Sequence, residues 1–212
     1  MRKLVLKMSV SLDGFVCGPN NEIDWIFRTS SDDSRAWVVN ILREADAHLM
    51  GSRTYADMAA FWPFSDTPFT AAMNDIPKIV FSRNGKDGAH VAGVTRALAD
   101  AKADRGQQRG VTPTEEVLLS WADPTIASGE LADEIRSLKE QPGNYLLAHG
   151  GALFAQSLAA AGLIDEYRLA IHPVVLGQGK GLFAGLHKPA DLRLVSATTF
   201  TSGGIGAVYQ PA

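Results

Sequence analysis

The chain has 212 residues, of which 46% are hydrophobic and 20% charged, and its formal net charge is −3. This composition predicts one globular domain with a sizeable core, and because acids and bases are mixed along the chain it argues against nucleic acid or a membrane surface as a partner. A lone cysteine, Cys17, excludes an intrachain disulfide, and the short apolar run at residues 1–7 is interrupted by charge, unlike a signal peptide, so we expect a cytoplasmic protein.

The first half of the chain predicts alternating strands and helices. Residues 4–12 alternate apolar and polar side chains with a period of two, which is typical of a strand, and Asp13-Gly14 ends the pattern. From about residue 32 the period becomes helical, with Asp32, Asp33 or Ser34 available as N-cap. Short apolar runs at 47–50 and 79–81 predict buried strands.

The second half continues in the same way and then loses its helices. In chain order we expect a strand at 117–121, a helix at 131–138, a strand at 145–148, a helix after Gly150-Gly151 that stops at Gly162, and a strand at 167–171. No helix separates the last two strands, at 192–200 and 205–209, which predicts an antiparallel pair. The fold class is therefore α/β, with three layers and a mixed, mostly parallel central sheet flanked by helices.

Residues 84–115 interrupt this alternation. They are rich in glycine and carry a charged stretch at 100–109, which predicts an irregular surface insertion with a short helix at 94–103. Such an insertion is either a lid or interface, or an ordinary solvated loop. The sequence shows no linker between two cores, so residues 1–212 are expected to form a single domain.

Three predicted strand ends lead through a small or polar turn into the start of a helix. They are Gly51-Ser52-Arg53-Thr54, Ser82-Arg83 and Gly150-Gly151-Ala152-Leu153-Phe154. The free N–H groups and the dipole at a helix start suit a phosphate, and arginine adds positive charge. Each turn alone is more often a plain strand–helix connection, and the Gly-Gly turn lacks the third glycine of the dinucleotide-binding fingerprint.

Several other catalytic motifs are missing. The five histidines form no H-E-x-x-H pair, and one cysteine leaves no plausible zinc set, so no metal is expected. His172 is expected to be structural, and no G-x-S-x-G elbow occurs. The glycines at 177–181 lack the spacing of a P-loop. Because nothing activates a nucleophile, the chemistry is expected to belong to a bound cofactor.

Five ordered segments together are similar to the dihydrofolate reductase-like family that includes the reductase domain of bifunctional riboflavin-biosynthesis deaminase–reductases. They are MSVSLDGFVCGP at 8–19, DWI at 24–26, LMGSRTY at 49–55, PKIVFSR at 77–83, and the stretch from Leu146 to Gly177. The resemblance covers nearly the whole chain apart from the insertion after Arg83. The H-x-E and P-C-x-x-C motifs of the deaminase half do not occur, so a stand-alone reductase is expected.

The resemblance implies that NADPH lies across the strand ends of a central mixed sheet. Its phosphates would contact Gly51–Thr54, its 2′-phosphate would lie near Ser82-Arg83, and its pyrophosphate and nicotinamide would lie against Gly150–Phe154. The loop from Asp13 to Gly18 would cover the nicotinamide and part of the substrate pocket. The resemblance then implies that Val16 and Gly18 contact the cofactor and that Asp13, Gly14 and Trp25 line the substrate pocket.

The activity so implied is hydride transfer to a polarised C=N or C=O carbon of a small pyrimidine- or pterin-like heterocycle. Asp13 is predicted to supply the proton or to anchor the substrate, although an Asp-Gly pair after a strand commonly just makes a turn. Trp25 is predicted to wall the pocket, with a purely core position as the alternative.

Two other functions remain open. A dihydrofolate or pterin reductase would need a carboxylate near Asp32 or Asp33 facing the pocket, and a non-catalytic module would bind NADPH or a pterin without turnover. Family relatives commonly pair, so a homodimer is expected, and the apolar run at residues 174–176 belongs either to its interface or to the core.

Overall fold

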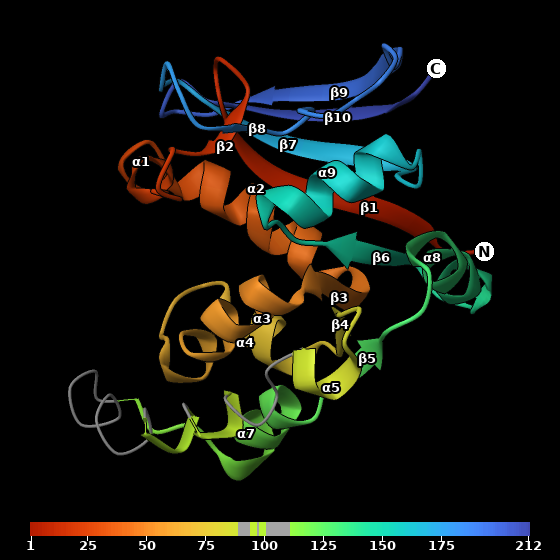
Figure 1. Ribbon diagram of the computed structural model, residues 1–212. Coiled ribbons are helices and arrows are strands. Elements are labelled where there is room, and N and C mark those ends of the chain that lie inside the picture. Colours follow the sequence, from red (N-terminus) through yellow and green to blue (C-terminus); the bar gives the residue numbers. More distant parts are fainter. Residues whose placement is uncertain (89–93, 97, 101–110) are drawn as a thin grey trace.

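A sheet of eight strands runs through the part of the chain that the computed structural model describes, residues 1–88, 94–96, 98–100 and 111–212 (Figure 1). The strand order is β5-β4-β3-β6-β1-β7-β10-β9. The bounds are β1 Lys3–Ser11, β3 Ala45–Gly51, β4 Lys78–Phe81, β5 Thr125–Ala127, β6 Tyr145–Ala148, β7 Glu166–His172, β9 Leu192–Thr199 and β10 Ile205–Pro211. The six strands from β5 to β7 are parallel, and β10 and β9 are antiparallel, which confirms the predicted mixed sheet.

Helices cover both faces of the sheet. The helices are α1 Asp24–Arg28, α2 Asp32–Arg43, α3 Ser52–Ala59, α4 Thr70–Asp75, α5 Gly85–Gly88, α7 Glu115–Ala122, α8 Leu131–Glu140 and α9 Ala152–Ala160, with a 3-10 turn at Trp62–Phe64. One core cluster lies between the sheet and helices α2, α3, α4 and α7, and another lies under α8 and α9. A separate two-stranded sheet pairs β2 (Phe15–Cys17) with β8 (Lys180–Gly181).

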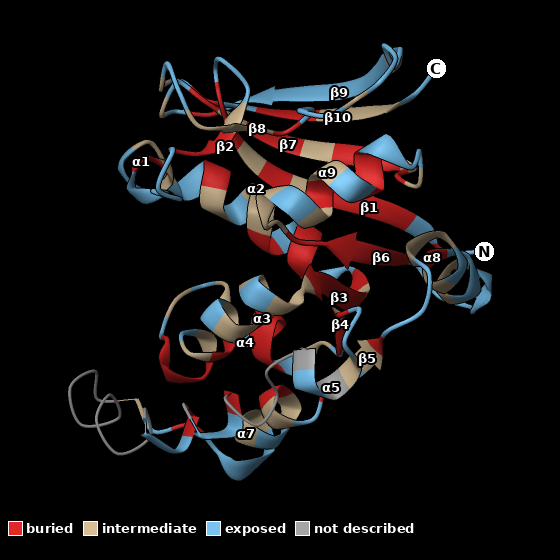
Figure 2. Ribbon diagram, viewed as in Figure 1, coloured by how far each residue is buried: buried red, intermediate tan, exposed pale blue. Residues whose placement is uncertain are grey.

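The central parallel strands are buried on both faces (Figure 2). In β6 every residue is buried, with Tyr145 and Leu147 facing one core cluster and Leu146 and Ala148 the other. A strand covered by helices on both sides must be apolar throughout, which is why this segment reads as a continuous apolar run. No helix in the described part of the chain is both long and apolar enough to cross a bilayer.

One predicted strand is a helix. Residues 117–121 lie inside α7, where the Thr114 hydroxyl accepts a hydrogen bond from the Val117 N–H (3.3 Å) and Glu115 and Glu116 occupy the first turn. A short apolar run does not distinguish a strand from a buried helix, whereas a threonine cap followed by two acids favours the helix. The strand that pairs with β4 is instead β5, at Thr125–Ala127.

Two smaller expectations also change. Helix α2 begins at Asp32, so its N-cap is Ser31, whose N–H donates to the Ser34 hydroxyl (2.9 Å). Within the predicted insertion, residues 94–96 and 98–100 are helical. Val94 and Leu98 are buried in the core cluster that lies between the sheet and helices α2, α3, α4 and α7. The insertion therefore contributes to the core, although the rest of the predicted helix and the charged residues 101–109 lie outside the described residues.

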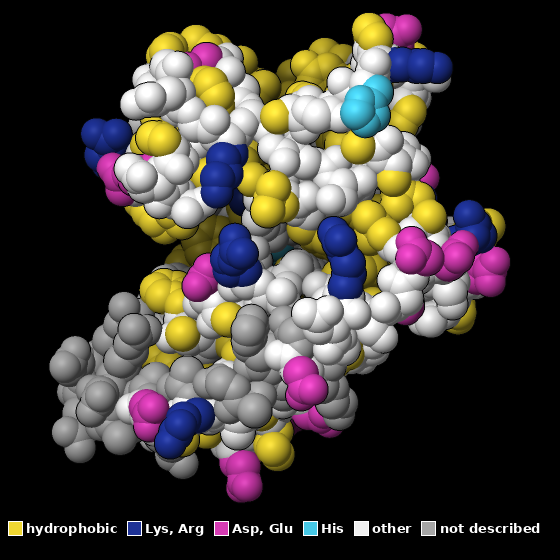
Figure 3. Space-filling view, in the orientation of Figure 1, with side chains coloured by type: hydrophobic (Ala, Val, Ile, Leu, Met, Phe, Trp, Pro, Cys, Tyr) yellow, Lys and Arg dark blue, Asp and Glu magenta, His cyan; other side chains and the backbone are white. Residues whose placement is uncertain are grey.

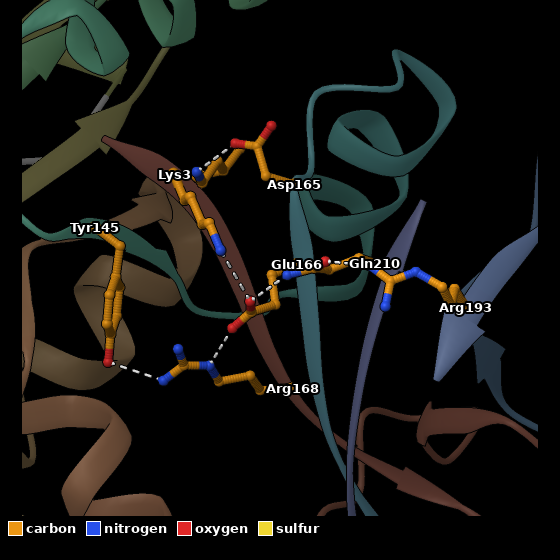
Figure 4. Close-up of polar contacts among 8 residues, drawn as sticks. Lys3, Tyr145, Asp165, Glu166, Arg168, Arg193 and Gln210 are labelled. Atoms are coloured by element: carbon orange, nitrogen blue, oxygen red, sulfur yellow. Dashed lines mark hydrogen bonds and ion pairs between the residues drawn. The ribbon is translucent and has the colours of Figure 1, made fainter. Parts of the chain in front are cut away.

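A buried carboxylate connects the strands at the edge where the parallel strands begin (Figure 4). Glu166 on β7 accepts hydrogen bonds from Arg168 Nε (2.7 Å) and Gln210 Nε2 (3.0 Å), and it lies 3.5 Å from Lys3 Nζ. Arg168 in turn donates to the Tyr145 hydroxyl (3.1 Å). These contacts thus join strands β1, β6, β7 and β10 at one edge of the sheet.

Candidate functional site

The three turns singled out in the sequence lie at the edge of the sheet where the parallel strands end. Gly51 at the end of β3 is in register with Phe81 at the end of β4, and Leu49 is in register with Ala148 at the end of β6. Because these strands are adjacent and parallel, the segments that follow them meet at one edge, the usual ligand site of open α/β sheets. The structure therefore brings the three turns together.

Two helices start side by side at this edge. Gly51 is the N-cap of α3 and Gly151 is the N-cap of α9, and neither helix has a side-chain cap. The Gly151 N–H donates to the Thr54 hydroxyl (2.9 Å), and a Cβ on Gly51 would lie only 3.5 Å from the Phe154 Cβ. The leading N–H groups of both helices thus form one electropositive edge that suits the phosphates of a nucleotide.

Positive side chains flank this edge. Arg53 in the first turn of α3 and Arg83 after β4 are both exposed, whereas Ser82 is buried and its N–H donates to Ala127 (3.0 Å). Figure 3 shows this face hollowed between the part carrying α1 and α9 and the part carrying α3, with Lys and Arg side chains beside the hollow. Both arginines are therefore free to meet an anion.

The loop after β1 is fastened by Asp13. Its carboxylate accepts hydrogen bonds from the Ser11 hydroxyl (2.6 Å), the Gly177 N–H (2.7 Å) and the Leu176 N–H (3.2 Å). The Ser11 hydroxyl and these N–H groups lower the pKa of the Asp13 carboxyl, so it stays ionised near neutral pH. Asp13 therefore makes the turn that was the alternative expectation, and its role in proton supply or substrate anchoring stays a prediction.

The other residues of this loop that were predicted to belong to the site are also held by contacts within the protein. Gly14 has a φ of +85°, which favours glycine, and Val16 is buried in the core under α9. The Gly18 N–H donates to the Glu22 carbonyl (3.0 Å). Contact of Val16 and Gly18 with a cofactor stays a prediction. In the loop after β7, Val175 is 66% exposed, so the core alternative for residues 174–176 is wrong, and an interface there stays a prediction.

A cavity of about 270 Å³ lies on the α2 face of the sheet, next to this edge. Its floor is the sheet, its walls come from α1, α2, α3 and α4, and the turn between β9 and β10 closes one end. Most of the lining is apolar or aromatic. The polar lining residues are Lys7, Ser9, Thr29, Ser34, Arg35, His149, His172 and Ser202. A largely apolar cavity with a few converging polar groups is the common form of a small-molecule site.

The predicted wall residue Trp25 lies behind the cavity. It is 1% exposed, its Nε1 donates to the Glu22 carbonyl (3.2 Å), and its ring meets His172 edge to face at 5.2 Å between centroids. Trp25 thus supports His172 from the core, which was the alternative expectation. From this region the cavity wall is formed instead by Ile23, Ile26 and Phe27.

Four basic side chains line the cavity, Lys7, Arg35, His149 and His172, and none of them was predicted as functional. Lys7, in the middle of β1, makes no hydrogen bond or ion pair with any residue that the structure describes, and burial lowers its pKa to about 8. Burial, then the charges of His48 and Lys7, lower the pKa of His149 well below its usual value. Burial and Lys7 likewise lower the pKa of His172 to about 4. At neutral pH Lys7 is therefore a cation between two neutral imidazoles.

No carboxylate occurs among the described residues that line this cavity. Asp33 accepts hydrogen bonds from the Thr201 N–H (2.8 Å) and hydroxyl (3.0 Å), and Asp32 pairs with Arg35 (2.6 Å) while fully exposed. The carboxylate that a folate or pterin reductase was expected to need is thus turned to other partners. Within the described ranges, no cluster of three or more His, Cys, Asp or Glu could hold a metal ion.

Comparison with known proteins identifies the relatives of the chain. Residues 2–205 match the family model of the RibD C-terminal domain. The uncharacterized protein YyaP of Bacillus subtilis strain 168 is 29% identical over 209 residues, which cover 99% of this chain and 95% of YyaP.

Solved structures show the same fold. A putative riboflavin biosynthesis protein from Shewanella sp. PV-4 superposes with a TM-score of 0.68 at 19% identity, covering 100% of this chain and 99% of its own. A second structure, from Thermotoga maritima, is that of a diaminohydroxyphosphoribosylaminopyrimidine deaminase/5-amino-6-(5-phosphoribosylamino)uracil reductase. It superposes with a TM-score of 0.61 at 15% identity, and the match covers 100% of this chain and 57% of the Thermotoga chain. These matches confirm the expected fold and resemblance, and the chain belongs to the RibD C-terminal domain family.

Proposed function

We propose that the chain is an NADPH-dependent reductase that acts on a small pyrimidine- or pterin-like heterocycle bound in the cavity. The observation that carries the proposal is that His149 lines the cavity while the next residues, Gly150 and Gly151, lead into the uncapped start of α9. Helix α3 likewise begins at the edge and lines the cavity through Met58. A nucleotide held at the edge would therefore present its reactive end to the cavity.

The residues at the edge fit NADPH. The leading N–H groups of α3 and α9 would hold its phosphates, and Arg53 and Arg83 would meet its charge, including the 2′-phosphate that distinguishes NADPH from NADH. When bound, NADPH supplies a hydride. The Thermotoga relative is named as a reductase of a substituted aminouracil, which supports a nitrogen heterocycle as the acceptor.

Residues of the cavity would polarise the hydride-accepting carbon of the substrate and exclude water from it. Lys7 is the only cation held on the sheet floor among the described lining residues, and its unpaired ammonium can hold a proton against a carbonyl or imine of the substrate. That contact polarises the neighbouring carbon, because the ammonium stabilises negative charge on the oxygen or nitrogen. The aromatic and aliphatic walls exclude water, which strengthens this interaction.

Binding of the cofactor is tested by titrating the protein with NADPH and with NADH while following tryptophan emission. We expect NADPH to bind at least about tenfold more tightly, and Arg53→Ala and Ser82→Ala/Arg83→Ala to lose about tenfold or more in NADPH affinity. Arg136→Ala, on the exposed side of α8, is the matched control. If neither nucleotide binds at millimolar concentration, the proposal fails. Binding without oxidation across a broad substrate panel would favour the non-catalytic module.

A single methyl group at the edge should also weaken NADPH binding. In Gly151→Ala the new Cβ would lie 2.7 Å from the Thr54 hydroxyl, so this side chain must turn away and its hydrogen bond with the Gly151 N–H is disturbed. We expect NADPH affinity to fall about tenfold with little loss of stability, since the contact is made by one flexible side chain. In the control, Gly181→Ala, the Cβ meets nothing closer than 3.8 Å. Unchanged affinity in Gly151→Ala would place the phosphates elsewhere.

A further inference from the structure

Buried polar atoms without partners converge on the cavity. Within the described part of the chain such atoms belong to Asp46, His48, His149, His172 and Ser202, and the last three of these residues line the cavity. Ser202 lies in the turn after β9, whose Gly203 and Gly204 approach Pro173 and Ile171 on either side of His172. Since buried polar groups are nearly always hydrogen-bonded, these unpaired atoms point to a polar ligand.

The hydrogen bonds around His172 fix its tautomer. The Thr29 hydroxyl donates its one hydrogen to the Trp25 carbonyl (2.7 Å), and the same oxygen lies 2.7 Å from His172 Nδ1. Because that hydrogen is already used, Nδ1 must be the donor in the second contact. In a neutral imidazole the other nitrogen, Nε2, then carries a lone pair and can only accept.

The ring is also held in place and kept neutral. Trp25 contacts it edge to face from the core, and Thr29 fixes the Nδ1 edge. Burial and the charge of Lys7 both disfavour protonation of the ring and lower its pKa to about 4. His172 therefore presents a fixed acceptor, although nothing in the described protein donates to it.

Lys7 marks the other end of the cavity floor. In the register of β1 with β7, Lys7 is opposite Arg168 and Ser11 is opposite His172, so the two groups are four residues apart along the strands. At about 3.3 Å per residue their backbones are separated by about 13 Å. Because the two residues stand at different places along the cavity floor, their side chains suit opposite ends of a ligand better than neighbouring atoms on one edge.

We propose that His172 is a specificity-determining residue that accepts a hydrogen bond from a ring N–H or O–H at one end of a planar substrate, while the carbonyl at the other end faces Lys7. This inference rests on the proposed function and deepens it by naming the substrate class. The class is a neutral, fused heterocycle whose N–H and carbonyl lie across the ring from each other. Thr29 and Trp25 act as positioning residues through His172.

The test compares 4-quinolone, which has this arrangement, with 1-methyl-4-quinolone, which lacks the N–H. Equilibrium binding to the full chain should favour 4-quinolone about tenfold, the value of one hydrogen bond. The preference should vanish in His172→Leu and return in His172→Gln, whose amide oxygen can accept. His187→Leu, at an exposed position outside the cavity, is the matched control. Equal binding of both compounds, no binding of either, or a preference that survives in His172→Leu overturns the proposal.

Nitrogen-15 NMR of the histidine side chains gives a second, ligand-free measurement. His172 should show a proton on Nδ1 and none on Nε2, and Thr29→Val should shift the ring toward the other tautomer. A proton on Nε2 in the unsubstituted protein overturns the proposal. NADPH affinity measured in the same preparations separates the two hypotheses, because loss of the quinolone preference with NADPH binding intact leaves the proposed function standing.

Discussion

Replacing Glu166 by alanine is expected to lower the free energy of unfolding by about 3–4 kcal/mol. The Glu166 side chain is 8% exposed, and its removal leaves Arg168, which is 18% exposed, without its carboxylate partner. An uncompensated buried charge costs far more than the ion pair itself contributes, because the guanidinium has lost its water. Urea unfolding followed by circular dichroism measures the loss, and the melting temperature should fall by roughly 10 °C.

A double variant separates the charge from the packing. Glu166→Leu/Arg168→Met removes both charges and should recover much of the loss, whereas Asp133→Ala, which breaks an exposed pair with Arg136, should cost less than about 0.5 kcal/mol. A loss in Glu166→Ala no larger than that of Asp133→Ala would show that the carboxylate does not hold the strands together.

Because of the same carboxylate, the free energy of unfolding is expected to fall at acid pH. Burial raises its pKa, but the hydrogen bonds of Gln210 and Arg168 and the charges of Arg168 and Lys3 lower it by more, so the net shift is downward. A depressed pKa means that the stabilisation is present above the ordinary value near 4.5 and is lost as the pH falls through the folded-state value. This part of the acid sensitivity should be missing in the double variant.

Replacing Lys7 by methionine should lower turnover by at least about a hundredfold, with NADPH affinity unchanged. Methionine fills the space of the lysine stem in the cavity floor but holds no proton against the acceptor. The measurement is NADPH oxidation with the best acceptor from a panel of pyrimidine- and pterin-like heterocycles. Lys188→Met, at an exposed site outside the cavity, is the control.

The pH profile distinguishes a proton-holding lysine from a merely space-filling one. Because burial lowers the pKa of Lys7 to about 8, kcat/KM should be level below that pH and fall about tenfold per unit above it. The descending limb should be absent from the residual activity of Lys7→Met. A limb that persists in this variant would assign the ionisation to another group.

The sequence predicted most of the sheet because its signals are local. The period of two at residues 4–12, the apolar runs before Gly51 and Gly150, and the glycine at 162 each depend on near neighbours in the chain, and each element formed as expected. The prediction for segment 117–121 was wrong because a short run with four apolar residues fits either a strand or a helix. Its helical state is set by Thr114 and by packing against α4, which no window of that length contains.

The cavity was harder to predict than the edge where the strands end. The turns at Gly51 and Gly150 carry a motif, so they could be named from the sequence, whereas Lys7 and His172 become cavity residues only through pairing between β1 and β7. No signal in the sequence singled out Lys7, because it occupies one of the polar positions in the alternating pattern of residues 4–12. The hydrogen bonds of Asp13 could not be predicted because its partners, Leu176 and Gly177, lie in a loop far along the chain.

The position of β1 has a consequence for how the chain is made. Leu6 is in register with Ala148 on β6 on one side and with Tyr167 on β7 on the other, so β1 is synthesised about 140 residues or more before its neighbours. At roughly 5–20 residues per second, a ribosome needs about 7–30 seconds to deliver them. During that interval both edges of an apolar strand are unpaired, the condition in which nascent chains associate with one another or recruit chaperones.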